Sequence, residues 1–159
     1  SDHPRYPTQT LLLGAHKNFR MISDVLVRRA EQGGDAAAIA LLFLRWKMAM
    51  KSHEAYEENK LYPYLEWRWP LSCASLRDGH GELHACEQRV MAAAQEGRGA
   101  ASAALAEALR VHDAVLNAHL DLEEEIVIPA LLALSPEEFQ TYYDSDLDTL
   151  LQGDATSSA

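Results

Sequence analysis

Cysteine, long apolar runs and signal-like segments are what this sequence lacks. Its 159 residues include only two cysteines, Cys73 and Cys86, which are too few for a disulfide framework. No apolar run approaches the roughly 20 residues that cross a bilayer. The first ten residues, SDHPRYPTQT, have neither a basic start nor an apolar signal core. We therefore expect a cytoplasmic protein that does not enter a membrane.

Positive charge is also scarce. The chain has 14 Lys and Arg residues against 24 Asp and Glu residues, which gives a formal net charge of −10. Such a surface repels the phosphates of nucleic acids, and it repels acidic membranes for the same reason. We therefore expect neither nucleic acid nor a membrane among the partners of this protein.

Strand-like alternation of apolar and polar residues is missing as well, so we expect an all-α fold. Residues 9–32 instead place apolar side chains three and four positions apart, which predicts a helix that ends at Gly33. Asp35 can cap the next helix. Further helices are predicted over residues 36–63, 75–96, 101–129 and 135–151, with a turn over 68–75.

These helices predict one domain, residues 1–159, whose core is an antiparallel up-down four-helix bundle over about 9–132. The short helix over about 135–151 has Ser135 as its cap and Pro136 at its first position. We expect this fifth helix to pack against one end of the bundle, and residues 152–159 to form a mobile tail. Pro63 and Pro129 are expected to mark where their helices kink or end.

The placement of histidine is the main functional clue. Five of the seven histidines fall on predicted inward faces, and every helix of the bundle supplies at least one. They are His16, His53, His80, His84 and His119. Residues four apart on a helix point in nearly the same direction. Glu57 therefore shares the face of His53, His84 that of His80, and Glu123 that of His119.

A metal centre explains these residues better than core packing does. A buried imidazole or carboxylate without a partner costs of order 1–3 kcal/mol, and five imidazoles with two carboxylates cannot satisfy one another. Any one of these histidines, taken alone, fits a helix edge or a hydrogen bond in the core; together they favour a metal. We interpret His112 as a core residue or a partner of a ligand, and Gly81 as room for a close neighbour.

The donor set argues against a single zinc ion. Zinc usually takes four ligands, often thiolates, whereas seven candidates are present and none is a cysteine. The segment HGELH, residues 80–84, has the histidine spacing of a zinc protease helix. That motif needs Glu directly after the first His, and Gly81 stands there.

Imidazole and carboxylate together suit iron or manganese, and bridging carboxylates allow two ions in one bundle. Two octahedral ions have about twelve positions between them. If five histidines, two bridging glutamates and one bridging oxygen occupy eleven, one position stays open. Dioxygen, peroxide or nitric oxide could bind there.

The order of these motifs resembles the hemerythrin-like (HHE cation-binding) family. The resemblance covers about residues 10–132 and rests on His16, on HEAYEENKLYP at 53–63, on the pair His80 and His84, and on HLDLEEEIVIP at 119–129. It implies a non-haem diiron centre, with an oxo or hydroxo bridge, in a four-helix bundle. Proteins of this family carry, store or sense dioxygen, or react with nitric oxide or peroxide.

The resemblance also implies which residues bind the metal. By position they are His16, His53, Glu57, His80, His84, His119 and one of Glu123 or Glu124. Family members place the last carboxylate four or five residues after the histidine, and the four-residue offset of the second helix favours Glu123. Animal oxygen carriers have Asp as this ligand, so Glu is a departure that bears on reversible oxygen binding.

Three functions stay open at this point. A binding, storage or sensing protein would release dioxygen unchanged, whereas an oxidoreductase would turn over peroxide, nitric oxide or an organic substrate. A structural or storage site, possibly for zinc, is the third. The sequence has no flavin or nicotinamide motif, so an enzyme would take electrons from a separate protein or from its substrate.

Overall fold

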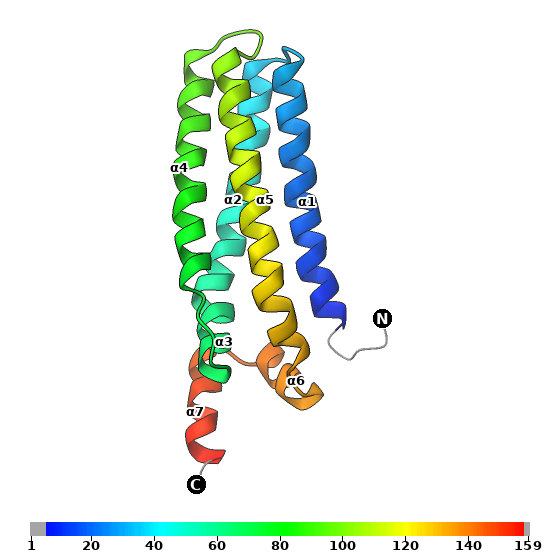
Figure 1. Ribbon diagram of the computed structural model, residues 1–159, viewed down its shortest axis with the longest axis vertical. Coiled ribbons are helices and arrows are strands. Elements are labelled where there is room, and N and C mark those ends of the chain that lie inside the picture. The colour runs from blue at the N-terminus through cyan, green and yellow to red at the C-terminus, as the bar shows by residue number, and fades with distance from the viewer. Residues whose placement is uncertain (1–5, 158–159) are drawn as a thin grey trace.

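The computed structural model describes residues 6–157 and the side chains of residues 12–153, and helices make up nearly all of this part of the chain (Figure 1). In chain order they are α1 (Tyr6–Glu31), α2 (Ala36–Tyr56), the π-helical turn η1 (Glu57–Leu61), α3 (Tyr62–Arg68), α4 (Ala74–Glu96), α5 (Ala103–Leu132), α6 (Pro136–Asp144) and α7 (Leu147–Ser157). None of them is both long and apolar enough to span a bilayer, within the part of the chain described.

The four long helices stand side by side and alternate in direction (Figure 1). α5 packs against α1 and α4, and α2 closes the ring by packing against the same two helices. This arrangement confirms the predicted antiparallel four-helix bundle. The short helices α6 and α7 lie at the end of the bundle where α1 begins (Figure 1).

The loops at the opposite end hold the two helical hairpins together. Gly33 and Gly99 follow α1 and α4 with φ angles of 71° and 75°, a left-handed conformation that glycine adopts without strain. The amide of Ala36 donates to the carbonyl of Gly99, and the amide of Ala101 donates to that of Gly34, each at 2.7 Å. These two bonds fix the position of the α1–α2 hairpin relative to the α4–α5 hairpin along the bundle axis.

Neither proline ends its helix, so of the two expected outcomes, a kink or an end, the second is wrong. Pro63 is the second residue of α3, and the chain stays helical to Arg68. A proline ring clashes with the carbonyl four residues before it, and the wider turn of η1, directly before α3, gives the room that an α-helical turn lacks. The irregularity expected near Pro63 takes this form. Pro129 lies inside α5, which ends at Leu132.

The predicted fifth helix is two helices. Ser135 and Glu138 form the expected capping box at the start of α6. The helix stops at Asp144, and the carboxylate of Asp146 then accepts from the amide of Thr149 at 2.8 Å to start α7. Residues 152–157 of the expected tail belong to α7, and residues 158–159 lie outside the described residues.

The buried core is divided along the bundle axis. One apolar cluster fills the end near the two loops and includes Leu26, Phe43, Trp46 and Leu109. A second fills the end covered by α6 and α7, and includes Leu65, Leu76, Leu131 and Tyr142. Most of the buried histidines and glutamates lie between these clusters, whereas His112 packs within the first one.

The cap of α2 gives a direct test of the bundle geometry. The carboxylate of Asp35 accepts from the amide of Ala38 at 3.0 Å, so Asp35→Ala should lower the free energy of unfolding by about 1 kcal/mol in urea titrations. Asp24→Ala is the matched control, because Asp24 makes an exposed pair with Arg28 on α1 and such pairs contribute about 0.5 kcal/mol or less. Equal effects of the two substitutions would contradict the capping role.

Candidate metal centre

Six of the seven side chains predicted to bind metal meet in the middle of the bundle. They form two groups of four, each with one donor atom per residue within 4.8 Å of the others. The first group is His16, His53, Glu57 and Glu123; the second is Glu57, His80, His119 and Glu123. The helices α1, α2, α4 and α5 each supply one histidine. Glu57 comes from η1 and Glu123 from α5.

The first group joins α1, α2, η1 and α5. His16 Nε2 lies 2.9 Å from Glu123 Oε1. His53 Nε2 lies 3.3 Å from Glu57 Oε2 and 3.9 Å from Glu123 Oε1. The two imidazole rings approach edge to face, with their centroids 5.4 Å apart. The Nε2 atoms and carboxylate oxygens therefore converge on one point, as the ligands of a metal ion do.

The second group joins η1, α4 and α5. His80 Nε2 lies 3.2 Å from Glu57 Oε1, and His119 Nε2 lies 3.7 Å from Glu123 Oε2. The centroids of the two rings are 4.9 Å apart. Each glutamate thus turns one oxygen to each group, so Glu57 and Glu123 are placed to bridge two ions.

Unpaired polar atoms inside the cluster also fit a metal. His53 Nε2 and Glu57 Oε2 are buried and make no hydrogen bond. Buried polar groups in proteins are nearly always paired, and each exception calls for a cause. Both atoms belong to the first group, and a cation at its convergence point would satisfy them, so the residues present fit a bound metal.

The charges of the cluster show what a metal must displace. Burial opposes protonation of His53, but Glu123 and Glu57 outweigh it and raise the pKa of His53 to about 10. His80 behaves alike: against burial, Glu57 and Glu58 raise its pKa to about 9. Burial lowers the pKa of His119 to about 4. Two imidazolium groups therefore balance the carboxylates when no metal is bound.

The two carboxylates differ from each other. Burial, with the neighbouring carboxylate adding to it, raises the pKa of Glu57. Burial acts on Glu123 too, but the hydrogen bond with His16 and the nearby His53 imidazole hold its pKa far below the usual range. Tyr62, which is fully buried on α3, also donates to Glu123 Oε2. Glu123 is thus the permanently charged member of the pair.

The second glutamate of each Glu-Glu pair supports a histidine from behind. Glu124 Oε2 lies 2.7 Å from His16 Nδ1 and accepts from Arg20 at the same distance. Glu58 Oε1 lies 2.9 Å from His80 Nδ1. A hydrogen bond at Nδ1 leaves Nε2 free for a metal and fixes the ring. The sequence left open whether Glu123 or Glu124 is the ligand. This geometry favours Glu123.

The structure places His84 outside the cluster. Its side chain is 55% exposed, and its Nε2 lies 3.1 Å from Glu54 Oε1 on the outer side of α2 and α4. Spacing by four residues aligns His84 with His80 around α4 but moves it one turn, about 6 Å, along the axis. Glu57 and Glu123 lie at the height of His80 along the bundle axis, so His84 is too far along that axis to join them.

Two residues of the site were not predicted. Glu54 is buried and has one oxygen without a hydrogen bond, while Tyr62 holds Glu123 and stacks on His80 with centroids 5.8 Å apart. Glu54 directly follows His53, so it does not share that face, and no spacing rule singles it out. Tyr62 joins the site because η1 shifts the facing of α3, which the sequence pattern does not reveal.

The glycine that matters is Gly79 and not Gly81. A methyl group on Gly79 would overlap Nδ1 of His119 and lie 3.1 Å from its Cε1, whereas a methyl group on Gly81 would meet nothing within 4 Å. Gly79 thus lets α4 approach the imidazole of His119. The interpretation of Gly81 as room for a neighbour is wrong.

His112 is a core residue and is not part of the cluster. Its ring packs edge-on against Phe43 and Trp46, with centroid distances of 5.2 and 4.7 Å. Burial lowers its pKa to about 4, so the ring is neutral. The Nε2 atom has no hydrogen-bond partner, and nothing in the structure explains that.

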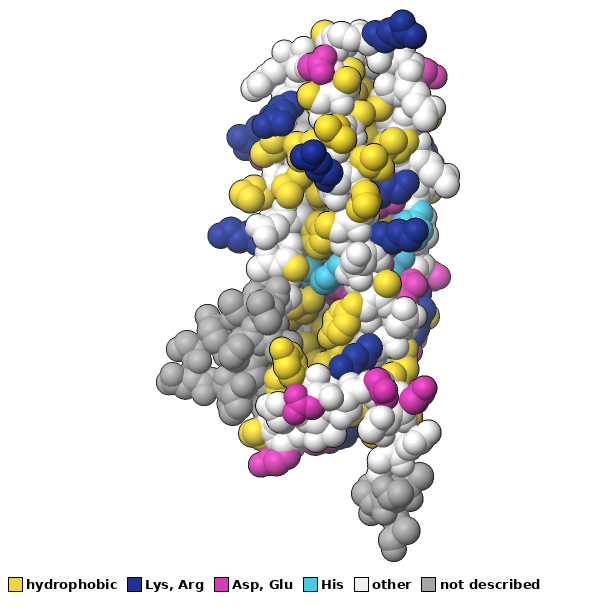
Figure 2. All heavy atoms as spheres, turned by 180° about the vertical axis from the view of Figure 1, so that it is seen from behind, with side chains coloured by type: hydrophobic (Ala, Val, Ile, Leu, Met, Phe, Trp, Pro, Cys, Tyr) yellow, Lys and Arg dark blue, Asp and Glu magenta, His cyan; other side chains and the backbone are white. Residues whose placement is uncertain are grey.

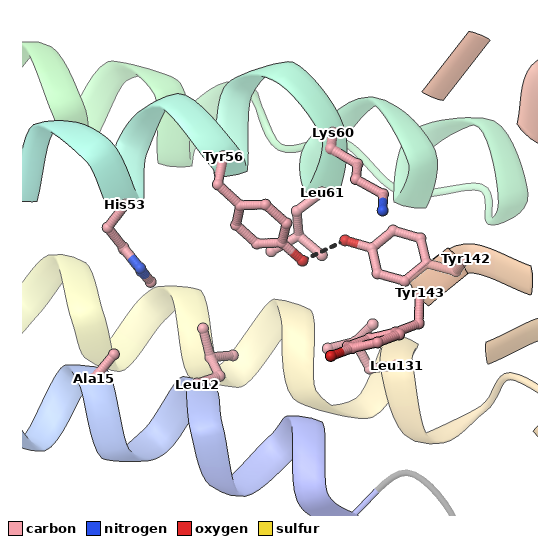
Figure 3. Close-up of a pocket in the computed structure, with 9 residues that line it drawn as sticks. All are labelled: Leu12, Ala15, His53, Tyr56, Lys60, Leu61, Leu131, Tyr142 and Tyr143. Carbon is pink, nitrogen blue, oxygen red and sulfur yellow. Dashed lines mark hydrogen bonds between the residues drawn. The ribbon is translucent and has the colours of Figure 1, made fainter. Parts of the chain in front are cut away.

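Access to the cluster runs past His53. Its side chain is 16% exposed, whereas the other five residues of the cluster are buried. His53 lies at the inner end of a cavity of about 360 Å³ between α1, α2, α5 and α6, lined mostly by apolar and aromatic groups (Figure 3). Histidine side chains also show at mid-height in the space-filling view (Figure 2). Small molecules can therefore reach the cluster without opening the bundle.

Gly79→Ala should weaken metal binding, because the added methyl group displaces the His119 imidazole. We expect affinity for Co²⁺ to fall at least about tenfold in titrations followed by absorbance, as for other losses of ligand geometry. Gly81→Ala is the matched control: its methyl group points into open space. That variant should bind normally and gain about 1 kcal/mol of helix stability. Normal binding by Gly79→Ala would contradict the role of this glycine.

Metal binding at pH 7 should release about two protons per chain, because the pKa values of His53 and His80, about 10 and about 9, lie above that pH. Calorimetric titration with Co²⁺ in buffers of different ionisation enthalpy measures this number. His84→Ala should leave it unchanged, since His84 lies outside the cluster. Release of no protons would show that the imidazolium–carboxylate pairs do not form.

A comparison with protein families agrees with this geometry. The model described as the hemerythrin HHE cation binding domain matches residues 8–131, a span that includes all six clustered side chains. No curated protein and no solved structure matches the chain. Because the matched span is well over half of the sequence, the chain belongs to the hemerythrin HHE cation-binding domain family.

Proposed function

We propose that this chain is a non-haem diiron protein that binds dioxygen or a related small oxidant for storage, transport or sensing. The proposed iron ligands are the six clustered residues, His16, His53, Glu57, His80, His119 and Glu123. The observation that carries the proposal is that both groups of donors share Glu57 and Glu123, an arrangement suited to two ions and not to one.

The donor chemistry supports iron over zinc. Each proposed ion takes two imidazoles and two bridging carboxylates, with no thiolate in either group. With His84 outside the cluster, the protein would supply four of the six positions that an octahedral ion takes. A shared oxygen would take a fifth on each ion and leave one open on each. When bound, such a pair supplies a redox-active position for dioxygen, nitric oxide or peroxide.

The chain's own residues fix and shield this centre. Glu124, held by Arg20, orients His16, and Glu58 orients His80. Tyr62 donates to Glu123 and so keeps one carboxylate oxygen in place. Phe19 covers His53 with a ring-centroid distance of 5.5 Å. These contacts exclude water from most sides of the centre and leave the cavity beside His53 as the route of entry.

A diiron oxidoreductase is the second candidate, and the cavity favours it. About 360 Å³ is far more than a diatomic molecule needs and lies within the range of pockets for small organic ligands. In that case an organic substrate or peroxide would be turned over, with electrons from a separate donor protein or from the substrate. We propose a cytoplasmic location for either function.

Iron content in two pairs of adjacent variants tests the proposed ligands. Glu57→Ala and Glu123→Ala remove a bridge to both ions and should hold less than half of the iron bound by the wild type, by elemental analysis. Glu58→Ala and Glu124→Ala are the matched controls. They leave both bridges intact and should still load about two irons at saturation, with affinity about 10- to 100-fold lower. Equal iron in all four variants would sink the assignment.

The absorption spectrum of the iron-loaded protein separates the functions. After anaerobic reduction, exposure to air should give a spectrum that decays slowly and returns on each cycle if the protein binds dioxygen reversibly. Immediate conversion to the oxidised spectrum would favour the oxidoreductase. A protein that retains zinc and no iron would contradict both and leave a structural or storage role.

A further inference from the structure

The cavity beside His53 has more structure than a passage for gas would need. Its volume is about 360 Å³. Leu12, Ala15, Leu61 and Leu131 form apolar walls, and Tyr56 and Tyr142 line it with their rings (Figure 3). The hydroxyl groups of these two tyrosines lie 2.5 Å apart and bond each other, with one as the donor and the other as the acceptor.

A lysine stands at the end of this cavity away from His53. Lys60 lines the cavity, and its ammonium nitrogen lies 4.6 Å from the centroid of the Tyr142 ring (Figure 3). Asp144 and Asp146 act on Lys60 electrostatically, but within residues 12–153 Lys60 makes no ion pair shorter than 4.0 Å. The cavity therefore has mostly apolar and aromatic walls, with a lysine towards one end and an imidazole at the other.

We propose that this cavity binds an apolar monocarboxylate, with its carboxylate on the Lys60 ammonium and its hydrocarbon end directed towards His53. A single ammonium group suits one carboxylate, whereas a phosphate ester would need several donors that the described walls do not offer. At the ~30 Å³ that a water molecule occupies in the liquid, the cavity holds about twelve non-hydrogen atoms. Decanoate has that size.

This assignment deepens the proposed function, and its placement beside a reactive centre rests on that function. A hydrocarbon end near His53 would lie beside the proposed iron pair and would make the bound acid a candidate substrate or a regulator of access. Binding itself depends only on the walls and on Lys60. The two proposals can therefore fail separately.

Calorimetric titration of the full chain with hexanoate, octanoate, decanoate and 1-decanol tests the binding. Each methylene that enters the cavity should tighten binding about fourfold. Decanoate should bind about tenfold more tightly than 1-decanol, which has the same chain without the charge. Equal binding of the acid and the alcohol, or no saturable binding of any of them, would overturn the proposal.

Lys60→Met keeps the length of the side chain and removes its charge. We expect it to weaken decanoate binding about tenfold and to leave 1-decanol binding unchanged. Lys51→Met is the matched control, because Lys51 is an exposed lysine of α2 that does not line the cavity. If Lys60→Met binds decanoate as tightly as Lys51→Met does, the carboxylate does not sit on Lys60 and the proposal is wrong.

The same titrations with protein as purified and after chelation distinguish this proposal from the previous one. Decanoate binding with dependence on Lys60 in a chain that holds no iron would support the cavity assignment while the diiron function fails. Two irons per chain without decanoate binding would give the opposite result.

Discussion

Two carboxylates face each other in the middle of this bundle, and most of the structure follows from that placement. Glu57 and Glu123 are almost fully buried, and each turns an oxygen to the same two groups of imidazoles. Two buried carboxylates so close together are strongly unfavourable unless a positive charge lies between or beside them. Protonated His53 and His80 can supply it, and so can two cations.

The remaining features hold the donors at one height. Hydrogen bonds between the loops after α1 and α4 fix the two helical hairpins against each other. Gly79 lets α4 come close to His119, and Glu58 and Glu124 set the rings of His80 and His16. Apolar clusters above and below the donors keep water out. Each helix is therefore positioned by packing that does not involve the metal, and the ligands need little rearrangement to bind it.

Patterns of period 3.6 predicted most of the fold, and six of the seven side chains predicted to bind metal lie together in the cluster. Those rules describe direction around a helix and say little about height along it, which is why His84 was grouped with His80. Gly79 and Gly81 are indistinguishable in sequence, because what separates them is the position of His119 on another helix. The sequence did not predict the π turn at Glu57–Leu61 for the same reason, because its position depends on packing against other helices. Asp146 divides the last helix through a local cap that periodicity does not register.

The π turn η1 limits which deletions this sequence can tolerate during evolution. A π turn accommodates one residue more than the α-helical turn that it replaces, and each residue rotates a helix by ~100°. The facing of α3, and with it the contact between Tyr62 and Glu123, is therefore in phase with α2 only while that extra residue is present. Loss of a single codon between Glu57 and Leu61 would straighten the helix and turn Tyr62 away from the centre. The length of this segment is therefore constrained as strictly as the identity of Glu57 within it.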